Sequence, residues 1–401
     1  MIDTNRQQIL KWCDQCVLCG LCVPHCPTYQ LENNESESPR GRIVLIQALM
    51  RGVLDHKKSD LASLEHCLLC RSCEAVCPSK VPYGEIIALA RDEIKPKQSG
   101  LVYQLMDAVA EPKQMQSLRS KLKFYRGSGI QKLVRGSGLL RGEYRAAEGM
   151  LKFISTESLK DYYPAISGSR GEVLLYGGCM GETFDQQTVI DAISLLNRLG
   201  FGVRLNHPSG CCGAMHHHNG DVKTGTALRA ATQNTLFKSN ADYIVGLASS
   251  CVARLNEKDG EELPITELTD FLITYKEELM DGFSPMKLRV AVHRPCTNKN
   301  LLKNFDKTLE LLNHLPGLEL VELPTYGCCG ASGTHMVSDA EHARKFLYES
   351  LRWLRTEGID LIVSQNMGCM LHLSTEMDRE NMGIDVIHPI SLLLKSLIRK
   401  N

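Results

Sequence analysis

Two groups of cysteines near the start of the chain have the spacing of iron–sulfur ligands. Each group reads Cys-x2-Cys-x2-Cys-x3-Cys-Pro, which places three thiolates on one tight loop and directs a fourth away from it. In this pattern the fourth cysteine ligates the cluster of the other group. Zinc is the alternative, because CxxC pairs also build zinc ribbons, but two full copies with both prolines favour two [4Fe–4S] clusters. The predicted ligand sets are Cys16, Cys19, Cys22 and Cys77 for the first cluster, and Cys67, Cys70, Cys73 and Cys26 for the second. Cys13 lies one step upstream and is expected to be a spare thiol.

A different cysteine arrangement occurs twice farther along the chain. Each copy has one cysteine, then an adjacent pair followed by glycine 32 residues later (179 to 211 and 296 to 328), and then a fourth cysteine. Four thiolates are enough for a metal ion or a cluster, and the glycine permits a positive φ or a close approach of the backbone. The residues are Cys179, Cys211, Cys212 and Cys251 in the first copy, and Cys296, Cys328, Cys329 and Cys369 in the second. We expect at least one copy to hold zinc or a third cluster, with the second copy the better candidate.

His293 precedes Cys296 by three residues in the sequence HRPC. It is a possible further ligand of the second copy, and a satisfied structural histidine is an equally good interpretation. The triplet His216 to His218, directly after the first Cys-Cys-Gly, is expected to be a solvated or capping run at a helix start.

The elements around the repeated cysteines alternate between short apolar strands and amphipathic helices. Strand-like runs EVLLY, DYIVG, LRVAVH and DLIVS precede Cys179, Cys251, Cys296 and Cys369, and QTVIDAISLLNRLG and DKTLELLNHL have helical spacing. Such alternation predicts a parallel sheet built from βαβ units. Since ligands of open α/β sheets bind at the carboxyl ends of strands, the cysteines lie where a site is expected.

These elements predict a multidomain α+β chain with a mostly helical ferredoxin domain and two pseudo-symmetric α/β lobes. The expected boundaries are 1–95 for the ferredoxin domain, 96–168 for a cysteine-free helical linker, and 169–284 and 285–401 for the lobes.

Composition limits the partners and the compartment. Lys plus Arg and Asp plus Glu number 46 each, so nothing indicates nucleic acid. Grouped cysteines without a signal peptide or a long apolar run indicate a reducing, cytoplasmic setting. The basic segment 113–152, with Leu118, Leu122, Phe124, Leu133 and Leu139, permits peripheral association with the inner face of the cytoplasmic membrane, although packing on the protein is the favoured interpretation.

Nucleotide-binding motifs are missing from the sequence. No GxGxxG follows a strand and no GxxxxGK[ST] occurs, so neither a Rossmann flavin site nor a triphosphate site is indicated. A chain with clusters and no flavin site cannot split the two electrons of an organic substrate by itself.

Several stretches of the chain resemble one family. CPTYQL, SPRGRI, CLLCRSCEAVCPS, CCGA, HRPCT, CCGASGTH and NMGCMLHL are similar to the iron–sulfur subunit of bacterial glycolate oxidase (glycolate dehydrogenase), within the CCG-domain family to which heterodisulfide reductase also belongs. The resemblance implies an electron-transfer subunit that receives electrons from the FAD of partner subunits oxidising a 2-hydroxy acid, and delivers them to quinone or another acceptor. Each copy here ends in one cysteine where the fuller motif ends in CxxC, which argues against five-cysteine noncubane clusters.

Three alternatives to this function remain. The chain is an enzyme in its own right that reduces a disulfide, as in heterodisulfide reductase, or an iron–sulfur subunit for lactate or glycerol-3-phosphate oxidation. Alternatively, the paired-cysteine lobes bind zinc or nothing and serve as a docking platform.

Overall fold

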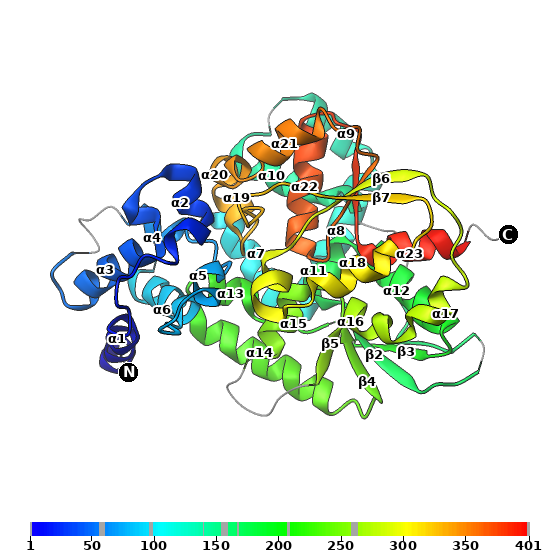
Figure 1. Cartoon of the computed structure of the whole chain (residues 1–401), viewed down its shortest axis with the longest axis horizontal. Coiled ribbons are helices and arrows are strands. Elements are labelled where there is room, and N and C mark those ends of the chain that lie inside the picture. Colours follow the sequence, from blue (N-terminus) through cyan, green and yellow to red (C-terminus); the bar gives the residue numbers. More distant parts are fainter. Residues whose placement is uncertain are drawn as a thin grey trace.

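The computed structural model describes residues 2–55, 61–95, 99–138, 140–153, 159–166, 168–206, 209–257 and 264–398. The N-terminal helices form one end of the molecule, and the two sheets with their helices form the rest (Figure 1). Within the described ranges no helix is both long and apolar enough to span a lipid bilayer.

The N-terminal domain is built from short helices around a small apolar core. Helix α3 begins sharply because Ser38 Oγ accepts a hydrogen bond from the Gly41 amide at 3.0 Å and Pro39 occupies the first turn. Ile9, Ile46 and Ile86 are buried where α1, α3 and α6 meet. The helices are α1 (Ile2–Cys13), α2 (Pro27–Glu32), α3 (Pro39–Met50), α4 (Ala62–Glu65), α5 (Ser72–Ala75) and α6 (Tyr83–Ile94), with 3-10 turns at Val23–His25 and Glu35–Glu37.

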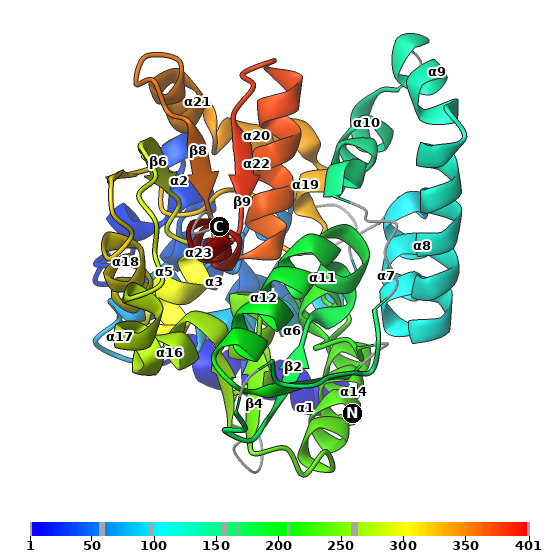
Figure 2. The same ribbon diagram turned by 90° about the vertical axis from the view of Figure 1, so that its right-hand side faces the viewer.

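The segment between this domain and the lobes is helical, and its long helix α8 lies along one side of the molecule (Figure 2). Leu118 and Leu122 pack against the core, but Phe124 is 70% and Leu133 is 76% exposed. The expectation that the apolar residues of this segment pack is therefore wrong for these two, and Leu139 lies outside the described residues. The elements are α7 (Gly100–Ala110), α8 (Pro112–Gly127), α9 (Ile130–Gly136), α10 (Gly142–Gly149) and a 3-10 turn at Met150–Phe153.

The first lobe contains a five-stranded sheet in the order β1-β3-β2-β4-β5. All neighbours are parallel except β1 with β3. Its strands are β1 (Tyr162–Tyr163), β2 (Glu172–Tyr176), β3 (Gly202–Leu205), β4 (Tyr243–Gly246) and β5 (Ile265–Glu267). Its helices are α11 (Gly178–Phe184), α12 (Gln186–Arg198), α13 (Ala214–His218), α14 (Val222–Phe237), α15 (Ser249–Leu255), α16 (Leu268–Leu272) and α17 (Lys276–Met280), with a 3-10 turn at Ile273–Tyr275.

The second lobe repeats this topology with four parallel strands in the order β7-β6-β8-β9, which corresponds to β3-β2-β4-β5. Its strands are β6 (Leu288–Val292), β7 (Leu318–Glu322), β8 (Leu361–Val363) and β9 (Asp385–Ile387). Its helices are a π-helical turn at Asn298–Leu302, α18 (Phe305–Asn313), α19 (His335–Ser338), α20 (Ala340–Lys345), α21 (Tyr348–Leu354), α22 (Met367–Arg379) and α23 (Pro389–Ile398). The predicted fold class, a helical ferredoxin-type domain followed by two α/β repeats, is confirmed.

The strand order explains where the cysteines gather. In the first sheet β3 pairs with one side of β2 and β4 pairs with the other side. In the second sheet β7 and β8 flank β6 in the same way, so the direction of strand order reverses at β2 and at β6. Cys179 follows β2, and Cys251 lies in α15 directly after β4. Cys296 and Cys369 have the same positions after β6 and β8. Both cysteine sets therefore lie at the point of a doubly wound sheet where ligands bind. The exact domain boundaries given above stay predictions.

Both Cys-Cys-Gly glycines have positive φ and are closely packed, as the sequence suggested. Gly330 has φ +87°, and a Cβ there would lie 2.5 Å from the carbonyl oxygen of Ala343. We expect Gly330→Ala to lose more than the roughly 1–2 kcal/mol that a positive φ alone costs. Gly327→Ala is the matched control, because Gly327 has φ +91° and open space around its Cβ position. Thermal unfolding under anaerobic conditions compares the two variants; equal losses would contradict the close contact.

Glu267, the N-cap of α16, gives the fold a dependence on pH. Its carboxylate accepts hydrogen bonds from the Thr269 amide at 3.1 Å and from Gln365 of the second lobe at 3.2 Å. Burial raises the pKa of Glu267 to about 8, from 4.5. Between these values the folded chain binds more protons than the unfolded chain, so the free energy of unfolding should fall as pH rises, by up to about 1.4 kcal/mol per pH unit. The test is the Tm of the wild type minus that of Glu267→Gln at pH 6 and pH 8: the difference should decrease, and a constant difference would refute the assignment.

Candidate iron–sulfur and metal centres

The structure brings the four cysteines of the first predicted set together. Cys16, Cys19, Cys22 and Cys77 all line one small hollow of about 30 Å³. Burial, followed by the nearby Cys16, Cys19 and Cys77 thiols, raises the pKa of Cys22 to about 11. The loop between them turns tightly because Leu18 and Gly20 adopt positive φ. Cys19 is exposed, so this site lies at the surface of the N-terminal domain.

The second predicted set lies deeper. Cys26, Cys67 and Cys73 are buried, and Cys70 is partly buried. Burial raises the pKa of Cys73 well above its ordinary value, and Cys70, Cys67 and Cys26 add to the effect because their charges face it. The fourth cysteine of each motif thus lies with the first three of the other, which is the crossed arrangement that the spacing predicts. Ligation itself stays a prediction.

A buried arginine stands beside the second set. Arg42 is 1% exposed, and its guanidinium donates to the Ser63 carbonyl at 2.6 Å and to the Glu37 carboxylate at 2.5 Å. It also lies 3.8 Å from Cys26 Sγ. A positive charge and a donor at this place stabilise the negative charge that a thiolate-ligated cluster carries. Glu37, the last of three glutamates between residues 32 and 37, is buried because its carboxylate pairs with Arg42.

The paired cysteines of the first lobe form a chain of sulfur contacts. Cys212 Sγ lies 3.3 Å from Cys251 Sγ. Hydrogen bonding with Cys211 and Cys251 lowers the pKa of the Cys212 thiol well below its ordinary value, and Arg254 contributes in the same direction. Contact with Cys179 and Cys212 raises the pKa of Cys211. The four thiols can therefore act as one donor set.

The second lobe has a more compact donor set. Cys329 Sγ and Cys369 Sγ are 2.9 Å apart, and Cys328 contacts Cys296. One ligand atom each of His293, Cys329 and Cys369 lies within 4.8 Å of the other two. In the part of the chain that the structure describes, only one other group of three His, Cys, Asp or Glu side chains brings its ligand atoms this close together.

His293 fits a metal-binding role. It is buried, and its Nδ1 lies 2.9 Å from Ser364 Oγ, while Nε2 has no hydrogen-bond partner. Burial lowers the pKa of His293 to about 4, so the ring is neutral at pH 7. A neutral imidazole with one nitrogen oriented by a hydroxyl and the other free is the form that ligates metals. The residues present thus fit a metal or cluster in the second lobe.

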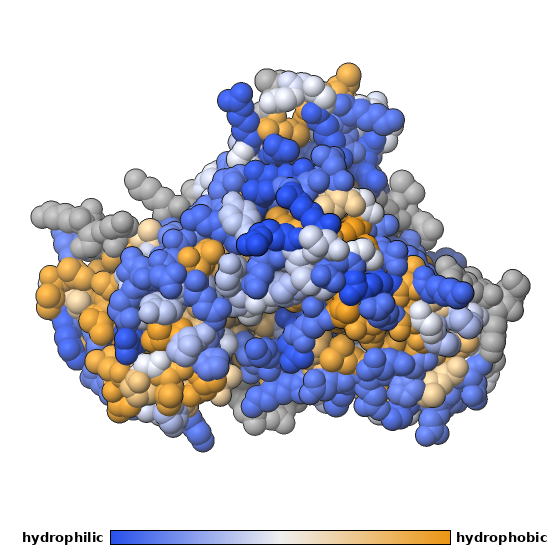
Figure 3. All heavy atoms as spheres, turned by 45° about the horizontal axis from the view of Figure 1, so that its top comes forward, coloured by the Kyte–Doolittle hydropathy of each residue, from blue (hydrophilic) through white to orange (hydrophobic). Residues whose placement is uncertain are grey.

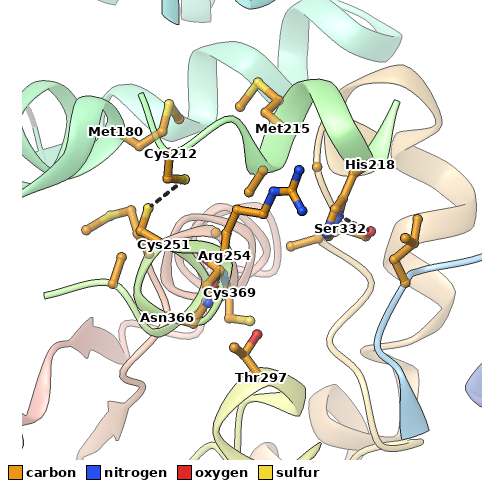
Figure 4. A pocket seen from close by; sticks show the side chains of 18 of the residues that line it. Met180, Cys212, Met215, His218, Cys251, Arg254, Thr297, Ser332, Asn366 and Cys369 are labelled. Atoms are coloured by element: carbon orange, nitrogen blue, oxygen red, sulfur yellow. Dashed lines mark hydrogen bonds between the residues drawn. The ribbon is translucent and has the colours of Figure 1, made fainter. Parts of the chain in front are cut away.

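One cavity lies between the two paired-cysteine sites and is lined by cysteines of both. Its volume is about 170 Å³, and its walls are mostly apolar. Arg254 extends into it from α15, below Met215 and beside the sulfur pair Cys212 and Cys251 (Figure 4). Arg254 also pairs with Glu257.

The histidine triplet does not lie in solvent, and His217 and His218 line this cavity. His216 and His217 are buried in α13, and His218 is partly buried with its Nδ1 3.2 Å from Ser332 Oγ of the second lobe. His217 Nε2 lies 3.3 Å from the Glu85 carboxylate of the N-terminal domain. The expectation of a solvated run is wrong because three domains meet here.

The second cluster site and the second lobe are neighbours, which the sequence did not indicate. Cys70 and Cys296 both pack against a buried group formed by Leu68, Cys328 and Phe346. Asn300 Nδ2 donates to the Cys70 carbonyl at 2.8 Å across a separation of 230 residues. No motif links residues this far apart, so only the folded chain shows the contact.

Comparison with known proteins supports these domains. Residues 12–81 match the 4Fe-4S dicluster domain, and residues 173–256 and 290–374 match the cysteine-rich domain named CCG.

Similar proteins extend over nearly the whole chain. The probable glycolate oxidase iron-sulfur subunit of Bacillus subtilis (strain 168) is 29% identical over 414 residues, covering 95% of this chain and 93% of that protein. The glycolate oxidase iron-sulfur subunit of Escherichia coli (strain K12) is 28% identical over 378 residues, covering 90% and 89%. Lactate utilization protein A 2 of Bacillus cereus (strain AH820) is 26% identical over 244 residues, which is 56% of this chain and 99% of that protein.

Proposed function

This chain joins a 4Fe-4S dicluster domain to two CCG cysteine-rich domains and is an electron-transferring iron–sulfur protein, and we propose that it serves a complex that oxidises glycolate or a similar 2-hydroxy acid. Two glycolate oxidase iron-sulfur subunits match it over at least 89% of either chain, which supports this substrate class. The substrate is oxidised on partner subunits that carry FAD.

The observation that carries the proposal is the order of the cysteine sites from the surface inward. The first set lies on an exposed loop, the second is mostly buried, and Cys70 of the second contacts the second lobe. When bound, a [4Fe–4S] cluster supplies the ability to take up and release one electron at a time. The chain holds its thiolates in series, so electrons enter at the surface site and leave through the second lobe.

The entry surface is apolar. Val17, Leu18 and Leu21 surround the exposed Cys19 and are between 50% and 69% exposed. In Figure 3 apolar atoms gather at the left end of the molecule, where the N-terminal helices lie. An apolar collar around an exposed redox site excludes water and lets a partner approach closely. We assign this collar to the flavoprotein partner.

Beyond the second cluster, the second lobe supplies the next centre. His293, Cys329 and Cys369, with Cys296 and Cys328 beside them, would hold a metal ion or a third cluster. The first-lobe set of Cys179, Cys211, Cys212 and Cys251 is the less compact candidate. Quinone is the acceptor class that suits a chain ending at a mostly apolar cavity, and association with the inner membrane face would bring it there.

A second candidate is a lactate-oxidising complex. Lactate utilization protein A 2 matches almost its full length, but this corresponds to 56% of the present chain, whereas the glycolate oxidase subunits match at least 90%. Glycolate is therefore the first substrate to test.

The experiment uses the chain purified anaerobically with its flavoprotein partners. Addition of glycolate should reduce the clusters, as seen by EPR, at a rate well above that with lactate or glycerol 3-phosphate. Reduction by lactate alone would favour the second candidate, and reduction by neither would refute the proposal.

Val17→Glu tests the entry surface. A charge placed on the collar should slow cluster reduction by the partner by at least about tenfold, since a charge left desolvated against an apolar contact costs more than about 1.4 kcal/mol. Reduction by dithionite should not change. Val53→Glu is the matched control, because Val53 is also exposed in the same domain but does not line the hollow formed by Cys16, Cys19, Cys22 and Cys77. Equal slowing by both variants would place the contact elsewhere.

A further inference from the structure

A second group of metal-ligating side chains lies where the N-terminal domain meets the second lobe. One ligand atom each of His66, Asp339 and His342 lies within 4.8 Å of the other two. His66 follows α4, and the other two residues lie at the start of α20, so the group joins segments that are more than 270 residues apart (66 to 339). None of the cysteine sets described above includes these residues.

His66 is already oriented as metal-binding histidines are. Its Nδ1 lies 2.7 Å from Glu37 Oε1, which leaves Nε2 as the free nitrogen. Glu37 is itself fixed by Arg42 at 2.5 Å. A carboxylate behind the ring sets the tautomer and raises the basicity of the opposite nitrogen, as in carboxylate–histidine–metal arrangements.

His342 offers a buried nitrogen that lacks a partner. Its side chain is 6% exposed, and Nδ1 lies 3.0 Å from His335 Nε2. Nε2 has no hydrogen bond, and the nearby Glu32 carboxylate lies 3.6 Å from it, too far to satisfy it. Leaving such an atom unpaired costs about 1–3 kcal/mol, which a bound cation would offset.

Asp339 adds the negative charge. Its Oδ1 accepts a hydrogen bond from the His342 amide at 3.2 Å as the N-cap of α20, so the second oxygen remains for a cation. Asp339 and His66 are partly exposed, which leaves a path for an ion to enter. Glu32 stands at the edge of the group, where it also pairs with Lys345 at 3.0 Å.

Packing of the histidine rings against one another does not by itself explain how His66, Asp339 and His342 are arranged. The rings of His66 and His342 stack with centroids 4.2 Å apart, and His335 meets His342 edge-on at 5.1 Å. Stacking accounts for the ring contact, but it does not account for a buried Nε2 without a partner or for an acid beside it.

We propose that His66, His342 and Asp339 bind a divalent transition-metal ion of the zinc type, which fastens the N-terminal domain to the second lobe. Two imidazole nitrogens and one carboxylate oxygen form a ligand set that zinc accepts, with water or Glu32 in the remaining position. The ion would hold the second cluster site against the lobe that follows it, because His66 is next to Cys67 in the chain.

The test uses the holoprotein with its clusters intact, treated with a chelator and then dialysed against zinc. Zinc per chain and the zinc X-ray absorption spectrum are measured. The expected result is about one zinc per chain surrounded by nitrogen and oxygen at about 2.0–2.1 Å, and a raised Tm. About one zinc per chain with only sulfur neighbours at about 2.3 Å and no nitrogen–oxygen shell would overturn the proposal, because a cysteine site would then account for all of the zinc.

Variants locate the ion. Asp339→Asn keeps an oxygen for the α20 cap and should fold, yet it should lose this zinc, as should His342→Gln. His314→Gln is the matched control and should retain the zinc, because His314 lies at the end of α18, where its ring bonds to the Glu310 carbonyl, and is not part of the proposed group. Unchanged zinc content and spectrum in both Asp339→Asn and His342→Gln would refute the site.

Discussion

Replacing Cys26 by Ala is expected to remove the EPR signal of the cluster site formed by Cys67, Cys70 and Cys73, although Cys26 belongs to the other sequence motif. The reason is geometric: Cys26 is buried with these three thiols, whereas Cys77 lies with Cys16, Cys19 and Cys22 around the exposed hollow. About four iron atoms should be lost or their cluster degraded. Electron transfer into the second lobe should stop, because the path loses its middle site.

The two signals are first assigned with Cys19→Ala and Cys70→Ala, each of which lies within the loop of one motif. Cys77→Ala should then resemble Cys19→Ala, and Cys26→Ala should resemble Cys70→Ala. Cys13→Ala is the control, because Cys13 is buried in the core of the N-terminal domain, and burial raises the pKa of its thiol to about 12. If Cys26→Ala instead removed the signal lost in Cys19→Ala, each motif would bind its own cluster and the crossed assignment would be wrong.

Arg42→Gln is expected to destabilise the N-terminal domain by about 3–5 kcal/mol, because it removes the only guanidinium beside the buried Glu37 carboxylate among the described residues and leaves it with His66 Nδ1. The substitution also removes the hydrogen bond that the Thr28 hydroxyl accepts from Arg42 at 2.9 Å. This hydroxyl lies 3.1 Å from Cys26 Sγ. Removal of a positive charge beside the second cluster should in addition lower its reduction potential, since the reduced form carries more negative charge. Tm and a redox titration followed by EPR measure both effects.

Arg40→Gln is the matched control for this prediction. Arg40 lies in the same helix, but its pair with Glu35 is exposed, and such pairs contribute about 0–1 kcal/mol. A double variant, Arg42→Met with Glu37→Leu, removes both charges and should recover part of the stability. If Arg42→Gln and Arg40→Gln had the same small effect, the account of a buried ion pair supporting the second cluster would be wrong.

Local patterns in the sequence predicted much of this structure. The strands before Cys179, Cys251, Cys296 and Cys369, the helices between them and the parallel sheets all follow from periodicity, because each depends on a few neighbouring residues. The gathering of the repeated cysteines follows as well, since equivalent strand ends meet at one edge of a sheet.

Contacts between domains could not be predicted in this way. Cys70 lies beside Cys296, and His66 lies beside His342, only because the N-terminal domain packs on the second lobe. No period or spacing in the chain signals such contacts. Packing of the N-terminal domain on the first lobe likewise gives the buried His217 its partner Glu85. Glu37 differs, because Arg42, five residues farther along the same domain, buries it.

The most direct test of the central claim is a count of iron, acid-labile sulfide and zinc per chain on anaerobically purified protein, with EPR during stepwise reduction. The account predicts at least about eight iron, a matching amount of sulfide, and two [4Fe–4S] signals that appear one electron at a time. Iron beyond eight, with a further signal lost in Cys329→Ser, would place a third cluster in the second lobe. Fewer than about four iron, with zinc in the cysteine sites of the N-terminal domain, would contradict the account, because the chain would then have no means of carrying electrons.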